Sequence, residues 1–279
     1  TTAAGGPELV EFASDGSVAA RHPVDVAFPV LHGPGGEDGT VQGLFATVGL
    51  PYVGADVAGS AVAIDKGAMK GRFHLNGLPQ VAYVAFQRDR WVHDRDDVLA
   101  ELHRVPAPWF VKPARQGSSI GISRAADVAA LDAAVAGALL HDDRVVVEEA
   151  VAGPRELEVG VLERDGHLEV SCVGEIVPAH DFYDFDAKYL VASRLDVPAG
   201  VDPATAAAIE AVARRAFVAI GCRGMARVDC FLAPDGRLLL NEINTIPGFT
   251  EASMFPRVWA ASGVPFPDLV GRLLAAARA

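Results

Sequence analysis

Residues 226–244 read ARVDCFLAPDGRLLLNEIN, in which two apolar runs flank an Asp-Gly pair. An Asp-Gly pair between apolar runs is among the strongest local signals for a β-hairpin. A two-residue turn at this pair places Asp229 directly opposite Glu242, and Arg227 opposite Asn244. Because side chains alternate along a strand, these four side chains lie on one face of the predicted hairpin.

The pairing of two carboxylates predicts a cation site. Opposed carboxylates on neighbouring strands, with Cβ atoms roughly 5 Å apart, repel each other unless a cation lies between them. Asn244 adds a third oxygen, and oxygen ligands without Cys or His favour Mg²⁺. Two alternatives stay open. The face is a solvated strand surface on which Arg227 neutralises Asp229, or a three-residue bulged turn shifts the register by one residue and separates Asp229 from Glu242.

Composition limits the classes of function. The chain has 279 residues, of which 51% are hydrophobic, so it has room for one large α/β domain or for two or three small lobes. A net charge of −12 without a Lys/Arg-rich run argues against binding to nucleic acid or to an anionic membrane. Three cysteines without CxxC spacing indicate neither disulfides nor a zinc site. With no long apolar run and no secretory signal, we expect a cytoplasmic protein.

The pattern along the chain suggests three lobes. Residues 1–54 alternate apolar runs with Gly-rich turns and predict part of a parallel α/β lobe, with a buried strand at Val24–Leu31. Residues 55–150 and 151–279 mix strands and helices without βαβ alternation and predict two α+β lobes. We expect helices from Ser60, over 126–140, over 203–220 and from Pro267, and strands over 145–149, 156–162 and 170–177. Because a buried parallel strand needs neighbours, we expect a further segment upstream of Thr1.

A glycine-serine loop follows the short apolar strand at 109–112. Its sequence, over residues 113–121, is PARQGSSIG. The two glycines allow positive φ angles that turn successive N–H groups towards one point, which suits phosphate oxygens. Ser118 and Ser119 add hydroxyl donors, and Lys112 adds a charge. The sequence is not a Walker A loop. The alternative is an ordinary hairpin turn without a ligand.

A series of motifs resembles the D-alanine–D-alanine ligases of the ATP-grasp superfamily, from about Asp25 to the C-terminus. The motifs are His32–Gly43 (HGPGGEDGTVQG), Asp65-Lys66, Val111–Pro113, Gly117–Gly121, Arg155–Val159, Phe182–Tyr189, Gly224–Asp229 and Asn241–Thr250. The resemblance implies an ATP-grasp fold, in which an incomplete N-terminal parallel α/β lobe precedes two α+β lobes that clamp ATP. It implies ligation of two D-alanines through a D-alanyl phosphate for peptidoglycan synthesis. It also implies a homodimer and two Mg²⁺ ions, with Mn²⁺ as a substitute.

The resemblance also implies roles for individual residues. Lys66 and Lys112 contact the ATP phosphates, and Glu148 and Glu156 hold the adenine amino group and the ribose. The resemblance implies two further ATP-binding residues, Ser119 and Lys188. It implies the metal ligands Asp229, Glu242 and Asn244, and the catalytic residues Arg227, Ser118, Tyr189 and Gly248. Arg227 and the Gly248 N–H stabilise an oxyanion. His32 lies near the first D-alanine, and Ser253 and Met254 contact the carboxylate of the second.

Several alternatives remain at this point. Lys66 is either a phosphate ligand or a solvated helix lysine. The loop over 180–197 is either a lid that excludes water or an aromatic loop packed on its own domain. Lys188-Tyr189 favours a dipeptide product over the ester product of a D-alanine–D-lactate ligase. A catalytically silent ATP-binding module is the third possibility. The chain departs from the family in lacking the Gly-rich turn whose Ser and Glu help to bind the first D-alanine.

Overall fold

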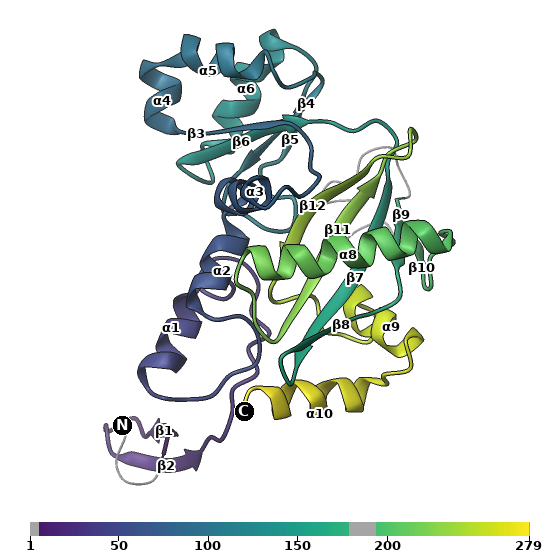
Figure 1. Cartoon of the computed structure of the whole chain (residues 1–279). Helices are drawn as coiled ribbons and strands as arrows, with labels where there is room; N and C mark the ends of the chain where they lie inside the picture. Colours follow the sequence, from purple (N-terminus) through teal and green to yellow (C-terminus); the bar gives the residue numbers. More distant parts are fainter. Residues whose placement is uncertain (1–5, 179–193, 279) are drawn as a thin grey trace.

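The computed structural model describes residues 6–178 and 194–278 (Figure 1). The helices in this part of the chain are α1 (Thr40–Thr47), α2 (Val57–Ile64), α3 (Lys66–Leu75), α4 (Arg88–His93), α5 (Arg95–Leu102), α6 (Val128–Ala138), α8 (Pro203–Ala219), α9 (Met254–Ala261) and α10 (Phe266–Ala276). The strands are β1 (Glu8–Phe12), β2 (Val18–Pro23), β3 (Tyr83–Gln87), β4 (Trp109–Pro113), β5 (Ser123–Ala125), β6 (Arg144–Glu149), β7 (Arg155–Arg164), β8 (His167–Val170), β9 (Gly174–Val177), β10 (Arg194–Asp196), β11 (Met225–Leu232) and β12 (Leu238–Asn244). No helix within these residues is long and apolar enough to cross a membrane.

A four-stranded antiparallel sheet forms one lobe, in the order β3-β6-β4-β5. The central strand β6 carries three consecutive valines, Val145–Val147, all of which are completely buried. A continuous apolar run of this kind is expected for a strand that is covered on both faces. Helices α4, α5 and α6 lie with this sheet at the top of Figure 1. Val98 of α5 and Leu131 of α6 belong to its core.

A larger antiparallel sheet forms the second lobe, in the order β10-β9-β7-β11-β12, with β8 paired to β7. Helix α8 packs against one face of this sheet, where Ile209 and Phe217 join Val228 in the core. Helices α9 and α10 contact β7 and belong to a separate core cluster. Helix α9 comes so close to β7 that a Cβ on Gly160 would lie 2.4 Å from Trp259 Nε1. The polar side chains of β7, β11 and β12 lie on the face opposite α8.

The hairpin of β11 and β12 differs from the prediction in its turn but not in its key pairing. Gly236 has φ of 86°, and Ala233 pairs with Arg237, so the turn has three residues rather than two. Such a turn shifts the register by one residue. The register shifts back beyond Cys230, where Asn241 forms a bulge, and Asp229 lies opposite Glu242 as predicted.

The N-terminal segment differs from the predicted parallel lobe. Its strands β1 and β2 form an antiparallel hairpin. The buried strand predicted at Val24–Leu31 is not formed over this range: Ala27 makes a single β-bridge, which is parallel as expected, to Tyr52, but Val30 and Leu31 are about half exposed, at 48% and 51%. Phe28 instead packs edge-on against Phe249, with ring centroids 4.9 Å apart. Pro29, which lacks an N–H group, follows Phe28 and also disfavours continued strand pairing.

The predicted helices α6, α8 and α10 and strands β6 and β7 are present within a few residues of their expected bounds. The strand expected over 170–177 is divided into β8 and β9, and both pair with β7. The helix expected from Ser60 ends at Ile64, because Asp65 has an extended backbone and caps α3. This break places Lys66 at the first turn of a new helix.

Candidate active site

Charged and amide side chains converge on the face of the larger sheet that lies opposite α8. Arg227 donates from Nε to Asp229 Oδ1 at 2.7 Å and from Nη2 to Asp229 Oδ2 at 2.6 Å. Its Nε also lies 3.1 Å from Oε2 of Glu158 on β7. Asn244 donates from Nδ2 to Asp229 Oδ2 at 3.1 Å and to Glu242 Oε1 at 3.4 Å. The four residues predicted to share a face therefore do so, together with Glu158.

The sequence left open whether this face is a cation site or a solvated surface on which Arg227 neutralises Asp229, and the structure has features of both. Arg227 neutralises Asp229, but the face is not solvated, since Asp229 is only 8% exposed. Burial acts to lower the pKa of Arg227, but Asp229 and Glu158 outweigh it and raise that pKa well above the ordinary value. The described residues contain no group of three or more His, Cys, Asp or Glu side chains already arranged around a metal position. The Asp229 and Glu242 carboxylates, with the oxygen of the Asn244 amide between them, nevertheless suit a hard cation.

A buried triad connects the smaller sheet to α3. Glu148 on β6 is 1% exposed, and its Oε2 lies 2.9 Å from Nζ of Lys70. Its Oε1 contacts Nζ of Lys112. Burial raises the pKa of Glu148, but Lys112 and Lys70 outweigh this effect and lower it to about 2. The sequence did not indicate Lys70, because a lysine on a helix is normally exposed and this one is 1% exposed.

Lys66 lies between the two sheets. Its backbone N–H donates to Ala114 O at 3.0 Å, and its Nζ donates to Gln116 O at 2.7 Å. Burial lowers the pKa of Lys66, and the charges that act on it are Glu242, Lys112, Glu148 and Glu37, which come from three parts of the chain. Lys66 is therefore not a solvated helix lysine. Its ammonium group contacts the glycine-serine loop and lies within electrostatic range of Glu242, a predicted metal ligand on the larger sheet.

The glycine-serine loop contains residues with positive φ, as expected, but two of the three are serines. Ser118 and Ser119 have φ of 52° and 58°, whereas among the two glycines only Gly121 has positive φ, at 71°. The expectation for Gly117 is therefore wrong. A positive φ costs free energy in a serine, and such strain is frequent at ligand-binding turns. A Cβ on Gly121 would lie 2.5 Å from His141 Cδ2, so close packing also favours glycine there.

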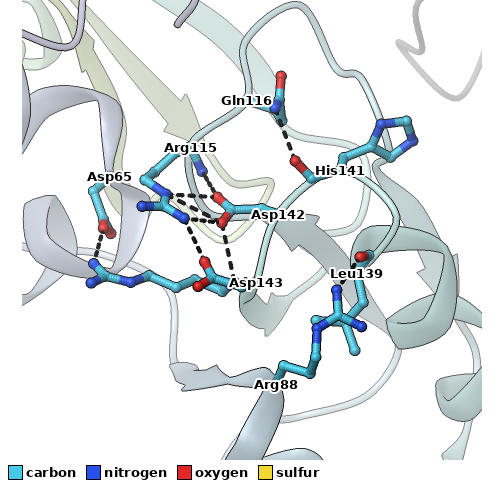
Figure 2. Close-up of polar contacts among 9 residues, drawn as sticks. Asp65, Arg88, Arg115, Gln116, Leu139, His141, Asp142 and Asp143 are labelled. Carbon is cyan, nitrogen blue, oxygen red and sulfur yellow. Dashed lines mark hydrogen bonds and ion pairs between the residues drawn. The ribbon is translucent and has the colours of Figure 1, made fainter. Parts of the chain in front are cut away.

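Figure 2 shows what lies beside this loop. Arg115 and Gln116, at its start, contact the turn between α6 and β6. Arg115 forms ion pairs with Asp142 and Asp143, and Gln116 donates to His141 O at 3.1 Å. The start of the loop is thus fixed by the turn that precedes β6.

The N-terminal segment contributes Glu37, to which the sequence analysis assigned no role. Its Oε1 accepts from Gly33 N at 2.9 Å. Burial raises the pKa of Glu37, and His32 is close enough to act in the opposite direction. His32 itself is exposed. Glu37 Oε1 also lies beside Gly117, at 3.6 Å from the position of a Cβ there, so this segment reaches the glycine-serine loop. The signal for Glu37 was its place in the His32–Gly43 motif.

The segment after β12 positions the residues predicted for the second amino acid. Ser253 Oγ accepts from Thr250 N at 3.1 Å and lies next to Gly248. The Met254 side chain is 5% exposed and belongs to the core under α9, against Gly174. Only the main-chain atoms of Met254, at the start of α9, are therefore available to contact a ligand.

Glu156 lies two residues before Glu158 on β7, opposite Phe231 of β11. Because side chains alternate, Glu156 is on the same face as the Arg227–Asp229 pair. The predicted lid residues Lys188 and Tyr189 lie outside the described residues.

Comparisons with known proteins agree with this geometry. The two antiparallel sheets of this chain, with their lysines and carboxylates, have the fold of the ATP-grasp ligases. Residues 4–55 match the family model for the D-ala D-ala ligase N-terminus, and residues 73–275 match that for the C-terminus. The chain therefore belongs to the D-alanine–D-alanine ligase family.

Individual relatives support the same assignment. The D-alanine–D-alanine ligase of Mycobacterium tuberculosis (strain H37Rv) is 54% identical over 259 residues, which cover 90% of this chain and 68% of the relative. That of Heliobacterium modesticaldum is 49% identical, over 90% of this chain and 69% of the relative. Among solved structures, the VanG D-Ala:D-Ser ligase from Enterococcus faecalis has a TM-score of 0.83 at 37% identity, over 91% of this chain and 73% of that chain. The D-alanine–D-alanine ligase from Coxiella burnetii has a TM-score of 0.81 at 33% identity, over 98% of this chain and 74% of that chain.

Proposed function

We propose that this chain joins two molecules of D-alanine and uses ATP to activate the first. The observation that carries the proposal is the position of Lys66, whose ammonium group donates to Gln116 O of the glycine-serine loop at 2.7 Å and is within electrostatic range of Lys112, Glu148 and Glu242. The relatives named D-alanine–D-alanine ligases, at about half identity, support the choice of substrate. The dipeptide would feed the synthesis of peptidoglycan precursors.

The reaction needs an activated carboxylate, since a free carboxylate is a poor acyl donor. A carboxylate oxygen of the first D-alanine attacks the γ-phosphorus of ATP and releases ADP, which gives D-alanyl phosphate. The amine of the second D-alanine then attacks the carbonyl carbon, phosphate leaves and a proton is lost, which gives the amide. Phosphoryl transfer depends mainly on positioning and charge neutralisation. Lys66, Lys112 and the Ser118-Ser119 turn supply both on the phosphate side, and Glu148 and Glu156 hold the nucleoside.

Asp229, Glu242 and Asn244 are the residues that we propose to hold Mg²⁺. The proposal rests on two carboxylates, Asp229 and Glu242, that share one face with the Asn244 amide and contact it. When bound, two such ions would neutralise negative charge on the phosphates, and Mn²⁺ would substitute. Arg227, which is paired with Asp229, would have to release it in part.

Arg227 and the Gly248 N–H are proposed to stabilise the oxyanion formed when the second D-alanine attacks. Neighbouring carboxylates keep Arg227 protonated, and a charged donor next to the reacting carbonyl lowers the barrier. His32 is proposed to contact the first D-alanine, and Ser253 and the Met254 main chain are proposed to hold the carboxylate of the second. That Ser118 bonds Tyr189 of a lid, with Lys188 on ATP, stays a prediction.

The cellular setting and the assembly are proposals as well. ATP as a co-substrate supports a cytoplasmic reaction. A homodimer stays a prediction from the family resemblance.

ADP release by the purified protein tests the function. With Mg²⁺ and ATP, we expect release that depends on D-alanine and yields the D,D-dipeptide. L-alanine is the matched control, because it differs only in the configuration at Cα. Release that is equal with L-alanine, or absent with both, would refute the proposal. An ester formed from D-lactate in preference to the amide would instead favour a D-alanine–D-lactate ligase, and ATP binding without turnover would favour a silent ATP-binding module.

A further inference from the structure

The carboxylate of Asp142 lies at the centre of the contacts in Figure 2. It belongs to the turn between α6 and β6, and its side chain is 2% exposed. Its Oδ2 accepts from the backbone N–H of Arg115 at 2.8 Å and from Arg115 Nε at 3.1 Å, and its Oδ1 accepts from Arg144 N at 3.2 Å. One buried side chain thus holds both the main chain and the guanidinium of Arg115.

Arg115 in turn determines where the next residue lies. The carbonyl of Gln116 accepts the hydrogen bond from Lys66 Nζ at 2.7 Å, and the Gln116 side chain donates to His141 O at 3.1 Å. The strained Ser118-Ser119 turn begins two residues later. A shift of Arg115 would therefore move both the contact that orients the Lys66 ammonium and the base of the turn.

The same α6–β6 turn also holds the helix that carries Lys66. Arg144 Nη1 donates to Asp65 Oδ2 at 2.6 Å, while Asp65 Oδ1 caps α3 by accepting from Ala68 N at 3.1 Å. Asp142 and Arg144 are two residues apart. The α6–β6 turn is therefore connected to the glycine-serine loop through Asp142 and to α3, which carries Lys66, through Arg144 and Asp65. The hydrogen bond from Lys66 to Gln116 O joins the two ends of this series of contacts.

We propose that Asp142 is a positioning residue for ATP: through Arg115 it sets the Gln116 carbonyl and the Ser118-Ser119 turn, and so the place of the Lys66 ammonium. Asp142 need not touch the nucleotide to do so. The proposal deepens the proposed function and rests on Lys66 and this loop as the phosphate site.

The neighbouring Asp143 provides a matched control. Its carboxylate contacts the same guanidinium, Nη2 of Arg115, but its side chain is 64% exposed and Asp143 holds no backbone N–H of the loop. Exposed ion pairs contribute little to stability or to position. Two adjacent aspartates on one arginine are thus expected to behave differently when each is changed to asparagine.

The experiment compares Asp142→Asn with Asp143→Asn in the full chain. We expect Asp142→Asn to raise KM for ATP and to weaken calorimetric binding of a non-hydrolysable Mg·ATP analogue by about 10- to 100-fold, the size expected for a misplaced binding group. KM for D-alanine should stay within about twofold, because the loop does not hold the amino acids. Asp143→Asn should leave all three quantities within about twofold.

Equal effects of the two substitutions, or an Asp142→Asn variant that loses affinity for ATP and D-alanine alike, would overturn the proposal. If Asp142→Asn does not fold, Arg115→Lys replaces it, because lysine keeps the charge but cannot form the guanidinium fork. That variant should weaken binding of the ATP analogue in the same direction, and unchanged binding would overturn the proposal. The binding measurement needs no turnover, so it tests Asp142 even if the wild-type chain fails to release ADP.

Discussion

Replacing Lys70 by methionine would remove one of the two cations that flank the buried Glu148. Methionine keeps most of the lysine volume, so the change removes charge with little change in packing. Lys70 is 1% exposed and pairs with Glu148 Oε2 at 2.9 Å, while Lys112 contacts the other oxygen. In the variant, Oε2 would be a buried anionic oxygen without its cation.

The size of the effect follows from the pKa of Glu148. Its fall from 4.5 to about 2 shows that the folded protein stabilises the ionised form. At 1.36 kcal/mol per pKa unit this shift corresponds to about 3 kcal/mol, shared between Lys112 and Lys70. Breaking a buried ion pair on one side costs about 3–5 kcal/mol when no partner remains. Since Lys112 remains, we expect a loss of about 2 kcal/mol, or about 4–8 °C in Tm for a chain of this size.

Thermal unfolding followed by circular dichroism near neutral pH measures this loss. A depressed carboxyl pKa contributes stability that is present above pH 4.5 and is lost as the pH falls through about 2, so the gap between wild type and variant should narrow over that range. The double variant Lys70→Met/Glu148→Gln is the control. Its Tm should fall less than that of wild type or Lys70→Met as the pH drops from 4.5 to about 2, because the carboxyl that titrates in this range is gone. A Lys70→Met Tm within about 1 °C of wild type would refute the reasoning, since the shift per kcal/mol is larger than that.

Two further changes test the larger sheet. Glu242→Gln keeps the shape of a proposed metal ligand but removes its charge, so D-alanine-dependent ADP release should fall by several orders of magnitude while the circular dichroism spectrum is unchanged; near-normal turnover would contradict the ligand role. Gly160→Ala places a Cβ 2.4 Å from Trp259 Nε1 and should cost about 1–3 kcal/mol in urea unfolding. Gly137→Ala in α6, where nothing lies within 4 Å, is its control and should instead stabilise by about 0.5–1 kcal/mol. Equal effects of the two glycine changes would contradict the packing argument.

Local patterns predicted those parts of the molecule that depend on neighbouring residues. The apolar run of β6 and the Asp202–Pro203 start of α8 have local causes, a buried strand and a capped helix with proline in its first turn. The break at Asp65, the two segments β8 and β9, and helix α9 were not predicted. Asp65 does carry a local signal, since it caps α3, whereas α9 depends on tertiary contacts with Gly160 and Gly174.

The site shows the same division. The sequence pattern alone indicated the oxygen-bearing side chains of the hairpin, Asp229 and Glu242. It also indicated Lys112, which precedes the glycine-serine loop. Lys70 was missed because its partner Glu148 is distant in sequence, and a lysine is expected in solvent. Glu37 was missed as a site residue because only the fold brings it near Lys66 and Glu242.

The hairpin is a case in which a wrong step led to a correct pairing. The turn is one residue longer than predicted, which alone would have placed Glu242 out of register with Asp229. The bulge at Asn241 restores the register before the functional residues. Bulges re-aim side chains near sites, and no local signal marks this one, since Asn241 lies between ordinary strand residues. The pairing of Asp229 with Glu242 therefore depends on two irregularities that compensate each other.

The charged groups proposed to bind ligands are already paired with one another. Lys112 contacts Glu148, Arg227 contacts Asp229 and Glu158, and Lys66 donates to the Gln116 carbonyl. Since an unpaired buried charge is costly, each proposed ligand contact must replace an internal one rather than fill an unmet need. The net gain from each exchange is then small, and positioning must supply much of the selectivity. This is the physical reason to look beside the site, at Lys70 behind Glu148 and at Asp142 behind Arg115, for residues that keep the exchanging groups in place.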